Sequence, residues 1–482
     1  MAAGASAGRA KLVSTYYDTE DRALARQGSV LRVRRRNGHY IQTVKSAGVP
    51  GSTLLARGEW EDAIAGERPD PLAGESGRFL TSDIADRVLP VFRTEVTRLV
   101  TDLSPAPGTR IEAAIDRGTI RAPGGKPGER ISEIELELKS GPVTALYDVA
   151  LRLLAEAPVR LEWRSKAERG YRLAAGHKIT QAVRADPFAL DPALSAEDAL
   201  QRIGRACLEQ VLRNEAAIFA GRTEGVHQMR VAVRRLRAVL SAFKRMLPPE
   251  QRRWASGELR WLADALGEAR NLDVFENALI RPAREALPDV AALRVLSAAA
   301  RRRRHTAYAA ARQAIRSPRY TALLLGLMRW FDGRGWRDGE AAGPLEQPIG
   351  DVGPPLLDKL RRTAKRRGKG FARQSAEERH KLRIALKKLR YTSEFLSGLY
   401  DAQAVEEFTA RLKRLQDDLG DSNDVRAAQD IVPELARGRD GATIARAGKI
   451  VLAWHHRRLV ARQSKTRRYL RRLLAAEPFW HG

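Results

Sequence analysis

Cysteine is almost missing from this chain of 482 residues, in which Cys207 is the only one. A single cysteine cannot form a disulfide within the chain, which is typical of proteins from a reducing compartment. No run reaches the roughly 18 apolar residues that a membrane span requires, so no spanning helix is expected. The beginning, MAAGASAGRAKLV, lacks the apolar stretch of a secretory signal. These absences predict a cytoplasmic protein, with Cys207 as a small core residue of a helix.

Aromatic residues make up only 6% of the chain, and no known nucleic-acid-binding motif is present. A base-stacking platform is therefore not expected. Positive charge, in contrast, is abundant. Residues 1–180 contain 28 basic and 23 acidic side chains, a net +5, and the remaining residues contain 58 and 35, a net +23. The second part is therefore predicted to bind a polyanion: polyphosphate, an anionic membrane surface, or nucleic acid without sequence specificity.

The pattern of apolar residues changes near residue 180. Before it, apolar and polar residues alternate as in β-strands, in SVLRVRRR, YIQTVK, GEWED, TRIEAAID and SEIELELK, and one helix is expected over 142–157. From Ser195, whose Ser-x-x-Asp pattern predicts a helix start, apolar residues recur at helical spacing. We therefore expect a β domain over 1–178, a linker over 179–194 and an all-α domain over 195–478. A Gly/Pro-rich stretch over 333–355 is expected to interrupt the helices.

The helical part contains one sequence block twice. HQMRVAVRRLR runs from His227 to Arg237, and HKLRIALKKLR runs from His380 to Arg390, 153 residues later. The same offset relates further identical residues, namely Leu262 to Leu415, Leu266 to Leu419 and Gly267 to Gly420. This repetition predicts that the helical unit arose by internal duplication.

Each block places basic residues on one stripe of a helix. At about 100° per residue, the basic stripe spans about 80° and is separate from an apolar stripe. The basic stripes consist of His227, Arg230, Arg234 and Arg237, and of His380, Arg383, Lys387 and Arg390. The apolar stripes consist of Met229, Val233, Leu236, Leu240 and Phe243, and of Leu382, Leu386, Leu389 and Leu396. We expect the apolar stripes to pack into the core and the basic stripes to face outward.

A row of like charges on one helix stripe is unfavourable, because side chains three and four positions apart repel one another. No acidic residue lies within either block. Arginine matches phosphate oxygens with a planar fork, lysine adds a point charge, and histidine changes its charge near neutral pH. Two interpretations remain open: the stripes bind phosphate groups, or they are solvated faces or pair with acids on neighbouring helices. The segments LADALGEARNLDV and LQDDLGDSNDV, related by the same offset, are expected to be structural.

The duplicated helices, the run KKLRYTSEFL and the segment LGEARNLDV resemble the CHAD domain, the conserved histidine α-helical domain. The resemblance covers roughly residues 193–478. It implies tandem four-helix bundles with a basic surface that binds inorganic polyphosphate. It also implies that the eight stripe residues bind the polyphosphate, namely His227, Arg230, Arg234, Arg237, His380, Arg383, Lys387 and Arg390.

The β part carries charged residues at strand spacing. In SEIELELKSG, the residues Glu133, Glu135, Glu137 and Lys139 alternate with apolar residues and so share one face of a strand. LRVRRR places three arginines in the same way. Facing rows of acids and bases inside a β-barrel are suited to hold a divalent metal and a phosphate chain together, since carboxylates bind Mg²⁺ or Mn²⁺. A half-exposed sheet with a charged outer face fits the same spacing equally well.

The segments STYYDTEDRALARQGSVLRVRRR, QTVK, EWE, AAIDRG, EIELELKSG and SKAERGY resemble, in this order, the CYTH family of triphosphate tunnel metalloenzymes, over residues 13–172. The resemblance implies an antiparallel β tunnel that hydrolyses inorganic triphosphate with Mg²⁺ or Mn²⁺. It implies triphosphate ligands at Arg32, Arg34, Lys45, Arg98 and Lys166. It implies metal ligands, or residues that position the attacking water, at Glu61, Asp116, Glu135 and Glu137, with Asp116, Glu135 and Glu137 as the catalytic residues.

One feature of that family is missing from the sequence. Its chains open with a strand carrying Glu-x-Glu-x-Lys, whereas residues 1–16 contain no acidic residue. Two explanations remain open: the given start lies too far downstream, or the strand has been lost. In the second case we expect an incomplete tunnel that lacks its first strand and exposes a strand edge. Two functions remain open: a polyphosphate-binding protein whose tunnel hydrolyses triphosphate, or a catalytically inactive adaptor on polyphosphate granules. Both would act in the cytoplasm.

Overall fold

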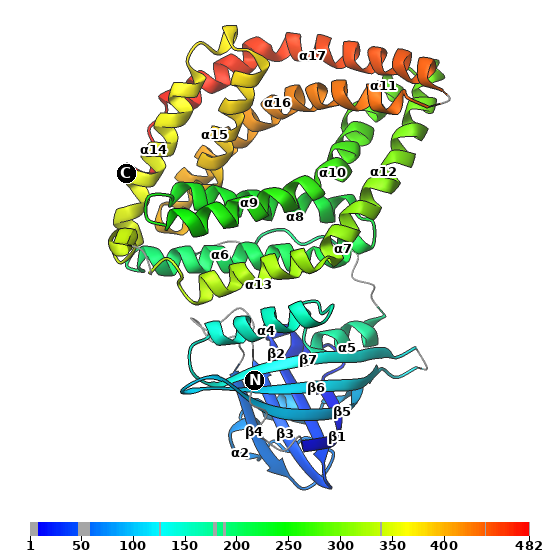
Figure 1. The fold of residues 1–482 in the computed structure, drawn as a ribbon, viewed down its shortest axis with the longest axis vertical. Helices are drawn as coiled ribbons and strands as arrows, with labels where there is room; N and C mark the ends of the chain where they lie inside the picture. The colour runs from blue at the N-terminus through cyan, green and yellow to red at the C-terminus, as the bar shows by residue number, and fades with distance from the viewer. Residues whose placement is uncertain are drawn as a thin grey trace. The chain divides into compact units, whose positions relative to one another are not determined.

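The structure is a computed structural model that describes residues 8–46, 58–124, 127–176, 181–186, 189–337, 340–438 and 440–481. The chain forms two compact units, Met1–Ile179 and Thr180–Gly482, drawn together in Figure 1. The expected linker over 179–194 lies partly outside the described residues. Among the described helices, none is long and apolar enough to cross a membrane.

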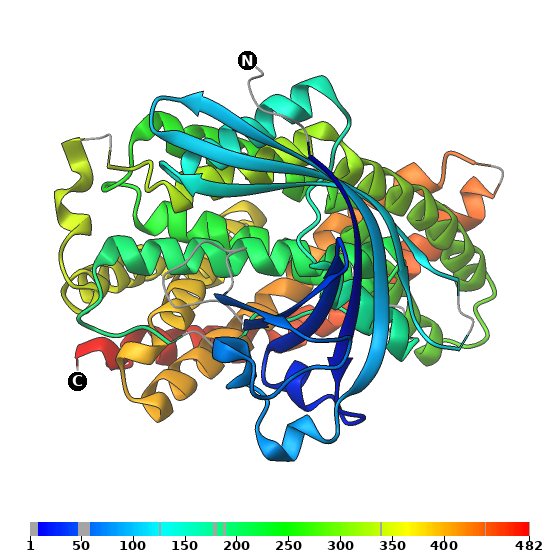
Figure 2. The same ribbon diagram turned by 90° about the horizontal axis from the view of Figure 1, so that it is seen from below.

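The first unit is built on one antiparallel sheet. In the described part, seven strands follow the order β4-β3-β2-β1-β5-β6-β7, so the sheet is open and β4 and β7 are its edges. The strands are β1 (Gly8–Asp18), β2 (Ser29–Arg36), β3 (His39–Ser46), β4 (Gly58–Ile64), β5 (Leu89–Ala106), β6 (Thr109–Arg121) and β7 (Glu129–Ser140). Figure 2 shows the strong twist of this sheet and the curvature of its long strands. The predicted antiparallel β architecture is confirmed, but β1 and β5 were not among the predicted strands.

Helices of the first unit are short except for two. They are α1 (Ala23–Arg26), α2 (Gly74–Gly77), α3 (Ser82–Ala85), α4 (Thr144–Glu156) and α5 (Lys166–Ala175). The helix expected over 142–157 is thus present as α4. An apolar cluster that includes Tyr16, Phe92 and Ala167 joins α5 to the sheet, with the rings of Tyr16 and Phe92 stacked 4.3 Å apart. A second cluster around Leu31 and Val44 packs the β2–β3 half of the sheet against α1 and α3.

Strand register places the predicted tunnel residues on one face of the sheet, because directly opposite residues of an antiparallel pair point to the same side. Glu61 lies opposite Thr43, which lies opposite Arg32. Arg34 lies opposite Ser14 of β1, and Ala10, four residues earlier on β1, lies opposite Arg98. Arg98 in turn lies opposite Asp116, which lies opposite Glu133. The charged residues therefore cross the whole sheet from β4 to β7 on a single face.

The second unit consists of two groups of packed helices. The first group contains α6 (Ala196–Arg213), α8 (Thr223–Ala242), α9 (Pro249–Ala265) and α13 (Pro318–Asp332), and the second contains α14 (Ile349–Gly368), α15 (Ala376–Phe395), α16 (Ala402–Leu435) and α17 (Gly441–Ala475). The remaining helices are α7 (Glu215–Phe219), α10 (Gly267–Val274), α11 (Arg281–Ala286) and α12 (Ala292–Arg316), and a π-helical turn over Phe275–Ile280 joins α10 to α11. The fold class predicted from the sequence, a β unit followed by tandem helical bundles, is confirmed.

The internal duplication is visible in the helix boundaries. A shift of 153 residues maps the first residue of α6 onto that of α14, of α8 onto that of α15, and of α9 onto that of α16. The segment from α9 to α11 therefore corresponds to the single long helix α16. Because α14 begins at Ile349 and contains Pro354 and Pro355, the last part of the stretch 333–355 is helical and does not interrupt the bundle as expected.

Both apolar stripes lie in the core, as the sequence predicts. Met229, Val233 and Leu236 of α8 are 0% exposed, and so are Leu382 and Leu386 of α15. Ser195 caps α6 by accepting a hydrogen bond from the N–H of Asp198 at 3.1 Å, which confirms the predicted helix start. The helix faces that bear the basic stripes are thereby fixed in orientation.

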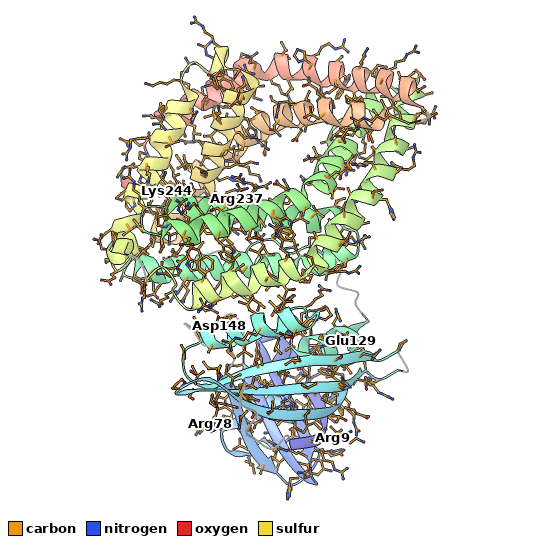
Figure 3. The ribbon with its side chains drawn as sticks, in the orientation of Figure 1. Arg9, Arg78, Glu129, Asp148, Arg237 and Lys244 are labelled. Carbon is orange, nitrogen blue, oxygen red and sulfur yellow. The ribbon has the colours of Figure 1, made fainter. Side chains whose placement is uncertain are left out.

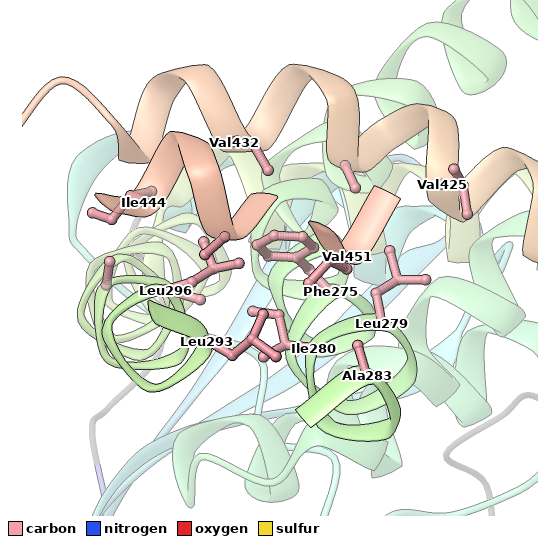
Figure 4. Close-up of a cluster of buried hydrophobic side chains, with 14 residues drawn as sticks. Phe275, Leu279, Ile280, Ala283, Leu293, Leu296, Val425, Val432, Ile444 and Val451 are labelled. Carbon is pink, nitrogen blue, oxygen red and sulfur yellow. The ribbon is translucent and has the colours of Figure 1, made fainter. Parts of the chain in front are cut away.

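A further apolar core joins the two copies of the repeat. It brings residues of the π-helical turn, α11 and α12 together with residues of α16 and α17 (Figure 4). Phe275, Leu296, Val425 and Val451 are among its buried members. The duplicated halves therefore share this core.

Truncation of one stripe leucine should measure how strongly the core fixes the basic helices. Leu386→Ala removes a fully buried side chain of α15, and we expect it to lower the free energy of unfolding by about 2–5 kcal/mol. Ile384→Ala, on the same helix, removes a side chain that is 42% exposed, and its effect should stay below about 1 kcal/mol. Denaturant unfolding followed by far-ultraviolet circular dichroism measures both, and similar losses for the two variants would contradict the assignment of core and surface faces.

Candidate functional sites

Three carboxylates of the sheet surround one lysine. Asp116 of β6 and Glu133 and Glu135 of β7 each offer an oxygen atom, and these atoms lie within 4.8 Å of one another. The Nζ of Lys166 lies 2.7 Å from Asp116, 2.5 Å from Glu133 and 2.6 Å from Glu135. Arg98 of β5 donates hydrogen bonds of 2.8 and 2.6 Å to the two oxygens of Asp116 and also contacts Glu135. We call these five residues the acidic cluster.

Local structure at the start of α5 holds Lys166 in this position. Ser165 caps the helix by accepting a hydrogen bond from the N–H of Glu168, and the Glu168 carboxylate accepts one from the N–H of Ser165 at 2.7 Å. Gly170 allows α5 to approach the sheet closely, because a Cβ at this position would lie 2.0 Å from the ring of Phe92. Lys166, the first residue of the helix, is consequently directed at β6 and β7.

Charges in the acidic cluster are balanced. Burial alone would raise the pKa of Glu135, but Lys166 and Arg98 lower it to about 2. Burial alone would lower the pKa of Lys166, but the three acids raise it above its usual value. Arg169, one turn along α5, adds a 2.5 Å salt bridge to Glu133. Three carboxylates therefore face Lys166, Arg98 and Arg169, which are three positive charges.

The acidic cluster has the donor chemistry of a divalent metal site. Carboxylate oxygens are the ligands that Mg²⁺ and Mn²⁺ prefer, and three of them here are close enough to share one ion. No other group of three such residues with this spacing is found in the part of the chain that the structure describes. The ammonium group of Lys166 stands where a cation would bind, so it would compete with a metal for the same oxygens.

A second polar group lies on the same face, on β2 to β4. Arg32 donates hydrogen bonds to Thr43 at 3.0 Å and to Glu61 at 3.2 Å. Lys45 lies 2.8 Å from Glu59, which also lies 3.4 Å from Arg32. Each base of this group is thus paired with an acid, as in the acidic cluster.

Arg34 is the exception on this face. Its Nε donates a 3.2 Å hydrogen bond to the hydroxyl of Ser14, and among the described residues it forms no salt bridge. Burial and the neighbouring Arg32 lower the pKa of Arg34 to about 10, with a further contribution from Arg98. The guanidinium therefore stays protonated at neutral pH and has donors free to bind an anion.

Most of the residues predicted for the tunnel are brought into these groups, with one exception. Glu137 lies apart from the acidic cluster, where its carboxylate is 63% exposed and 2.6 Å from Lys139. Glu133 and Arg169, in contrast, belong to the site although they were not predicted as ligands. The alternation in SEIELELK already placed Glu133 on the face of Glu135, so the signal for it was present in the sequence.

The two basic stripes of the helical unit do not form separate outward-facing rows. They lie on α8 and α15, which contact each other, and all eight stripe residues are half-buried. Arg234 of α8 interacts electrostatically with Arg383 and Lys387 of α15. Arg270 of α10 adds a further charge beside His227 and Arg230. We call the eight stripe residues together with Arg270 the cationic cluster.

Positive charge continues past the end of α8. Figure 3 labels Arg237 and Lys244 in this region, near α14 and α15. Both lower the pKa of Lys388, after the larger effect of its burial, and the ammonium group of Lys388 donates a 2.8 Å hydrogen bond to Ser241. The cationic cluster is therefore one end of a longer basic surface.

Few acids or acceptors satisfy the cationic cluster. Among its nine residues, the only salt bridge in the described part of the chain joins Arg390 to Glu394 at 3.4 Å. Five buried nitrogen atoms lack a hydrogen-bond partner within the described residues: Nε of Arg230, Arg234, Arg383 and Arg390, and Nδ1 of His227. Buried polar groups are nearly always paired in folded proteins, because an unpaired one costs about 1–3 kcal/mol. The concentration of unpaired donors here indicates a site for an anion.

Repulsion within the cluster changes its protonation. Burial, with neighbouring cations led by Arg234, lowers the pKa of Lys387 to about 6. Burial, with neighbouring cations led by Arg270, lowers the pKa of His227 to about 4. Both groups are therefore largely neutral at physiological pH, and both could take up a proton when an anion arrives.

The duplication offset shows where the two copies differ. Arg270 corresponds to Asn423, and Asn271 corresponds to Asp424. In the second copy, Nδ1 of His380 lies 2.9 Å from the side-chain oxygen of Asn423, where the first copy has an arginine. The sequence did not predict that Arg270 and Asp424 belong to this site, because both lie in the segments that were expected to be structural.

Comparison with protein families agrees with these two units. A family model of the CYTH domain matches residues 3–171, and a family model of the CHAD domain matches residues 202–433. The crystal structure of the CHAD domain from the plant Ricinus communis matches with a TM-score of 0.54 and 30% sequence identity, over 62% of this chain and 98% of that chain. The helical unit therefore has a solved relative over nearly that relative's full length.

Two curated proteins are similar to parts of the chain. Inorganic triphosphatase of Haemophilus influenzae is 34% identical over 170 residues, which are 35% of this chain and 47% of that protein. The uncharacterized protein Rv2226 of Mycobacterium tuberculosis is 30% identical over 232 residues, which are 47% of this chain and 43% of that protein. The chain thus spans about half the length of the curated relatives it matches. On this evidence the chain belongs to the CHAD family, with its CHAD domain preceded by a CYTH domain.

Proposed function

We propose that the helical unit binds inorganic polyphosphate at the cationic cluster, with the eight stripe residues as its ligands. The observation that carries this proposal is the set of buried nitrogen atoms without a hydrogen-bond partner on α8 and α15, in a cluster that forms one salt bridge among the described residues although Asp264 and Asp424 interact with it electrostatically. A chain of phosphates offers a negative charge at each unit, so one ligand can satisfy several arginines in succession. Arginine binds such oxygens through two parallel hydrogen bonds, which fixes the chain as well as attracting it.

The arrangement favours polyphosphate over nucleic acid. The described members of the cluster are half-buried and consist of arginine, lysine and histidine, so none of them offers the large aromatic face on which a base stacks. Nonspecific attraction of DNA to a surface of this charge is still expected. The protein would therefore associate with polyphosphate granules, and duplex DNA should compete poorly at physiological salt.

Neutralising the cluster tests this function. Glutamine at Arg230, Arg234, Arg383 and Lys387 together removes three permanent charges and the amine of Lys387 that can take up a proton, while keeping polar side chains, and we expect a loss of polyphosphate affinity of at least about 100-fold. The matched control carries glutamine at four exposed arginines of α17, namely Arg467, Arg468, Arg471 and Arg472. Isothermal titration calorimetry with polyphosphate measures both variants. Equal losses would mean that net charge, and not the cluster, binds the ligand.

Polyphosphate binding should also depend on pH. Because an anion offsets the repulsion around Lys387, the pKa of this lysine rises on binding from about 6 in the free protein. Binding therefore takes up a proton above pH 6, so affinity falls as pH rises, whereas below pH 6 Lys387 is protonated in both states and the dependence is lost. Calorimetry in buffers of different ionisation heat measures the uptake.

The comparison variant for this measurement is Lys387→Gln, which should lose the proton uptake contributed by the lysine. Since the end groups of polyphosphate titrate in a similar range, the difference between the wild type and this variant isolates Lys387. Lys381→Gln, an exposed position of the same helix whose lysine pairs with Glu377 at 2.5 Å, should behave as the wild type. Identical uptake in all three proteins would contradict the role of Lys387.

A second function, hydrolysis of inorganic triphosphate by the CYTH domain, is favoured by the charged face of the sheet. Asp116, Glu135 and the neighbouring Glu133 would hold a divalent metal, which when bound would neutralise charge on the phosphate oxygens. Arg34, with free donors, would bind the phosphate chain, and Arg32, Lys45, Arg98 and Lys166 would surround it. The carboxylates not engaged by metal, including Glu61 and Glu137, would orient the attacking water.

Phosphate release from inorganic triphosphate tests the second function. With Mg²⁺ present, we expect turnover that Glu135→Gln or Arg34→Gln reduces by about 100-fold or more, since each removes a group that stabilises charge at the phosphates. Glu75→Gln, at an exposed residue paired only with Arg78 at 2.9 Å, should retain it. If no metal-dependent release is found while polyphosphate still binds, hydrolysis is ruled out and the chain acts as an adaptor.

A further inference from the structure

Lys166 occupies the centre of the acidic cluster in a way that an ordinary surface salt bridge does not. Its Nζ contacts three carboxylates at 2.5–2.7 Å, from two strands, and its side chain is only 12% exposed. The Nζ donates a hydrogen bond to Glu135 and forms salt bridges with Asp116 and Glu133. Its positive charge is therefore neutralised by these carboxylates.

The same three carboxylates are the ones spaced to share a metal ion. An ammonium group among three carboxylates and a divalent cation among the same carboxylates need the same oxygen lone pairs. Asp116 has no alternative direction, since its side chain is fully buried and its other contacts go to Arg98. Lys166 and a metal ion therefore cannot occupy the cluster together.

We propose that Lys166 is a tethered cation that fills the metal position of the sheet, so that a divalent metal binds only when the lysine leaves. Because Lys166 is the first residue of α5, the long side chain can swing away while the capped helix stays in place. A balanced cluster then holds the sheet together before any metal arrives. The lysine makes the protein a weak metal binder by itself.

An anion on the same face would change this competition, an inference that rests on the proposed binding of phosphate by the CYTH domain. Arg34 interacts electrostatically with Arg98, which contacts Asp116 and Glu135. A phosphate held between these two arginines offers the Lys166 ammonium group new oxygens, which lowers the cost of leaving the carboxylates. Metal and phosphate would thus each favour the binding of the other. Neither metal nor phosphate alone would displace the lysine efficiently.

Binding of Mn²⁺ to the full chain tests the proposal without any turnover. The free Mn²⁺ signal in electron paramagnetic resonance gives the affinity. Lys166→Gln should bind Mn²⁺ at least about tenfold more tightly than the wild type, because the carboxylates lose their competing cation. Inorganic phosphate, a weak chelator, should raise the Mn²⁺ affinity of the wild type but have little effect on the variant.

A matched control separates the position of the lysine from its charge. Lys11→Gln removes one positive charge from an exposed residue of β1 in the centre of the same sheet, and its Mn²⁺ affinity should equal that of the wild type. Equal affinities of the wild type and Lys166→Gln would overturn the proposal, as would an equal gain in both lysine variants. Thermal melting of each protein verifies folding; if Lys166→Gln does not fold, Lys166→Met, which also removes the cation and keeps a long unbranched side chain, replaces it with the same expected gain.

These outcomes are independent of the proposed hydrolysis. If the wild type shows no turnover of triphosphate but Lys166→Gln gains Mn²⁺ affinity, the proposal for Lys166 is supported and the proposed hydrolysis is rejected. If turnover is present but the affinities are equal, the reverse conclusion holds.

Discussion

Apolar packing on one side of α8 and α15 forces positive charges together on the other side. Leu236 and Leu386 are fully buried, and the two helices contact each other, so Arg234 and Lys387 must share a space although they repel. Burial lowers the pKa of Lys387, and this repulsion lowers it further. The binding capacity of the surface is therefore set by the core: the apolar side chains supply the free energy that keeps the cations close, and an arriving anion relieves the repulsion.

The two units differ in how their basic side chains are paired. On the charged face of the sheet, Arg32, Lys45 and Arg98 each have an acidic partner, and even the candidate metal position is filled by Lys166. In the helical unit, the donors are left unpaired. A site whose charges are balanced is stable when empty, and a ligand must displace its internal partners to bind. A site with unpaired positive charge attracts any polyanion and can distinguish among polyanions only by shape. Placed in one chain, the two designs suit a transient small ligand and a long persistent one.

The spacing of apolar residues and the internal repeat were sufficient to predict much of the fold. The apolar stripes, the basic stripes, the start of α6 and five of the strands all follow from local spacing. The spacing of residues does not predict which helices contact each other. A helical wheel shows that Arg230 and Arg383 point away from their own cores, but it does not show that they point toward the same space. The same limit explains why the carboxylate partners of Lys166 were not predicted, since they lie on β6 and β7, 31 or more residues away along the chain. Only the beginning of α14, up to residue 355, was missed, because its prolines were taken as a break although the offset from α6 already required a helix there.

The core shared by the π-helical turn, α12, α16 and α17 has a consequence for each copy of the repeat. Half of its apolar side chains come from each copy of the repeat, so neither copy alone can shield them from water. A single copy by itself would therefore expose an apolar face, which a second copy must cover. Within that shared arrangement the copies differ in detail, since Arg270 of the first stands where the second has Asn423.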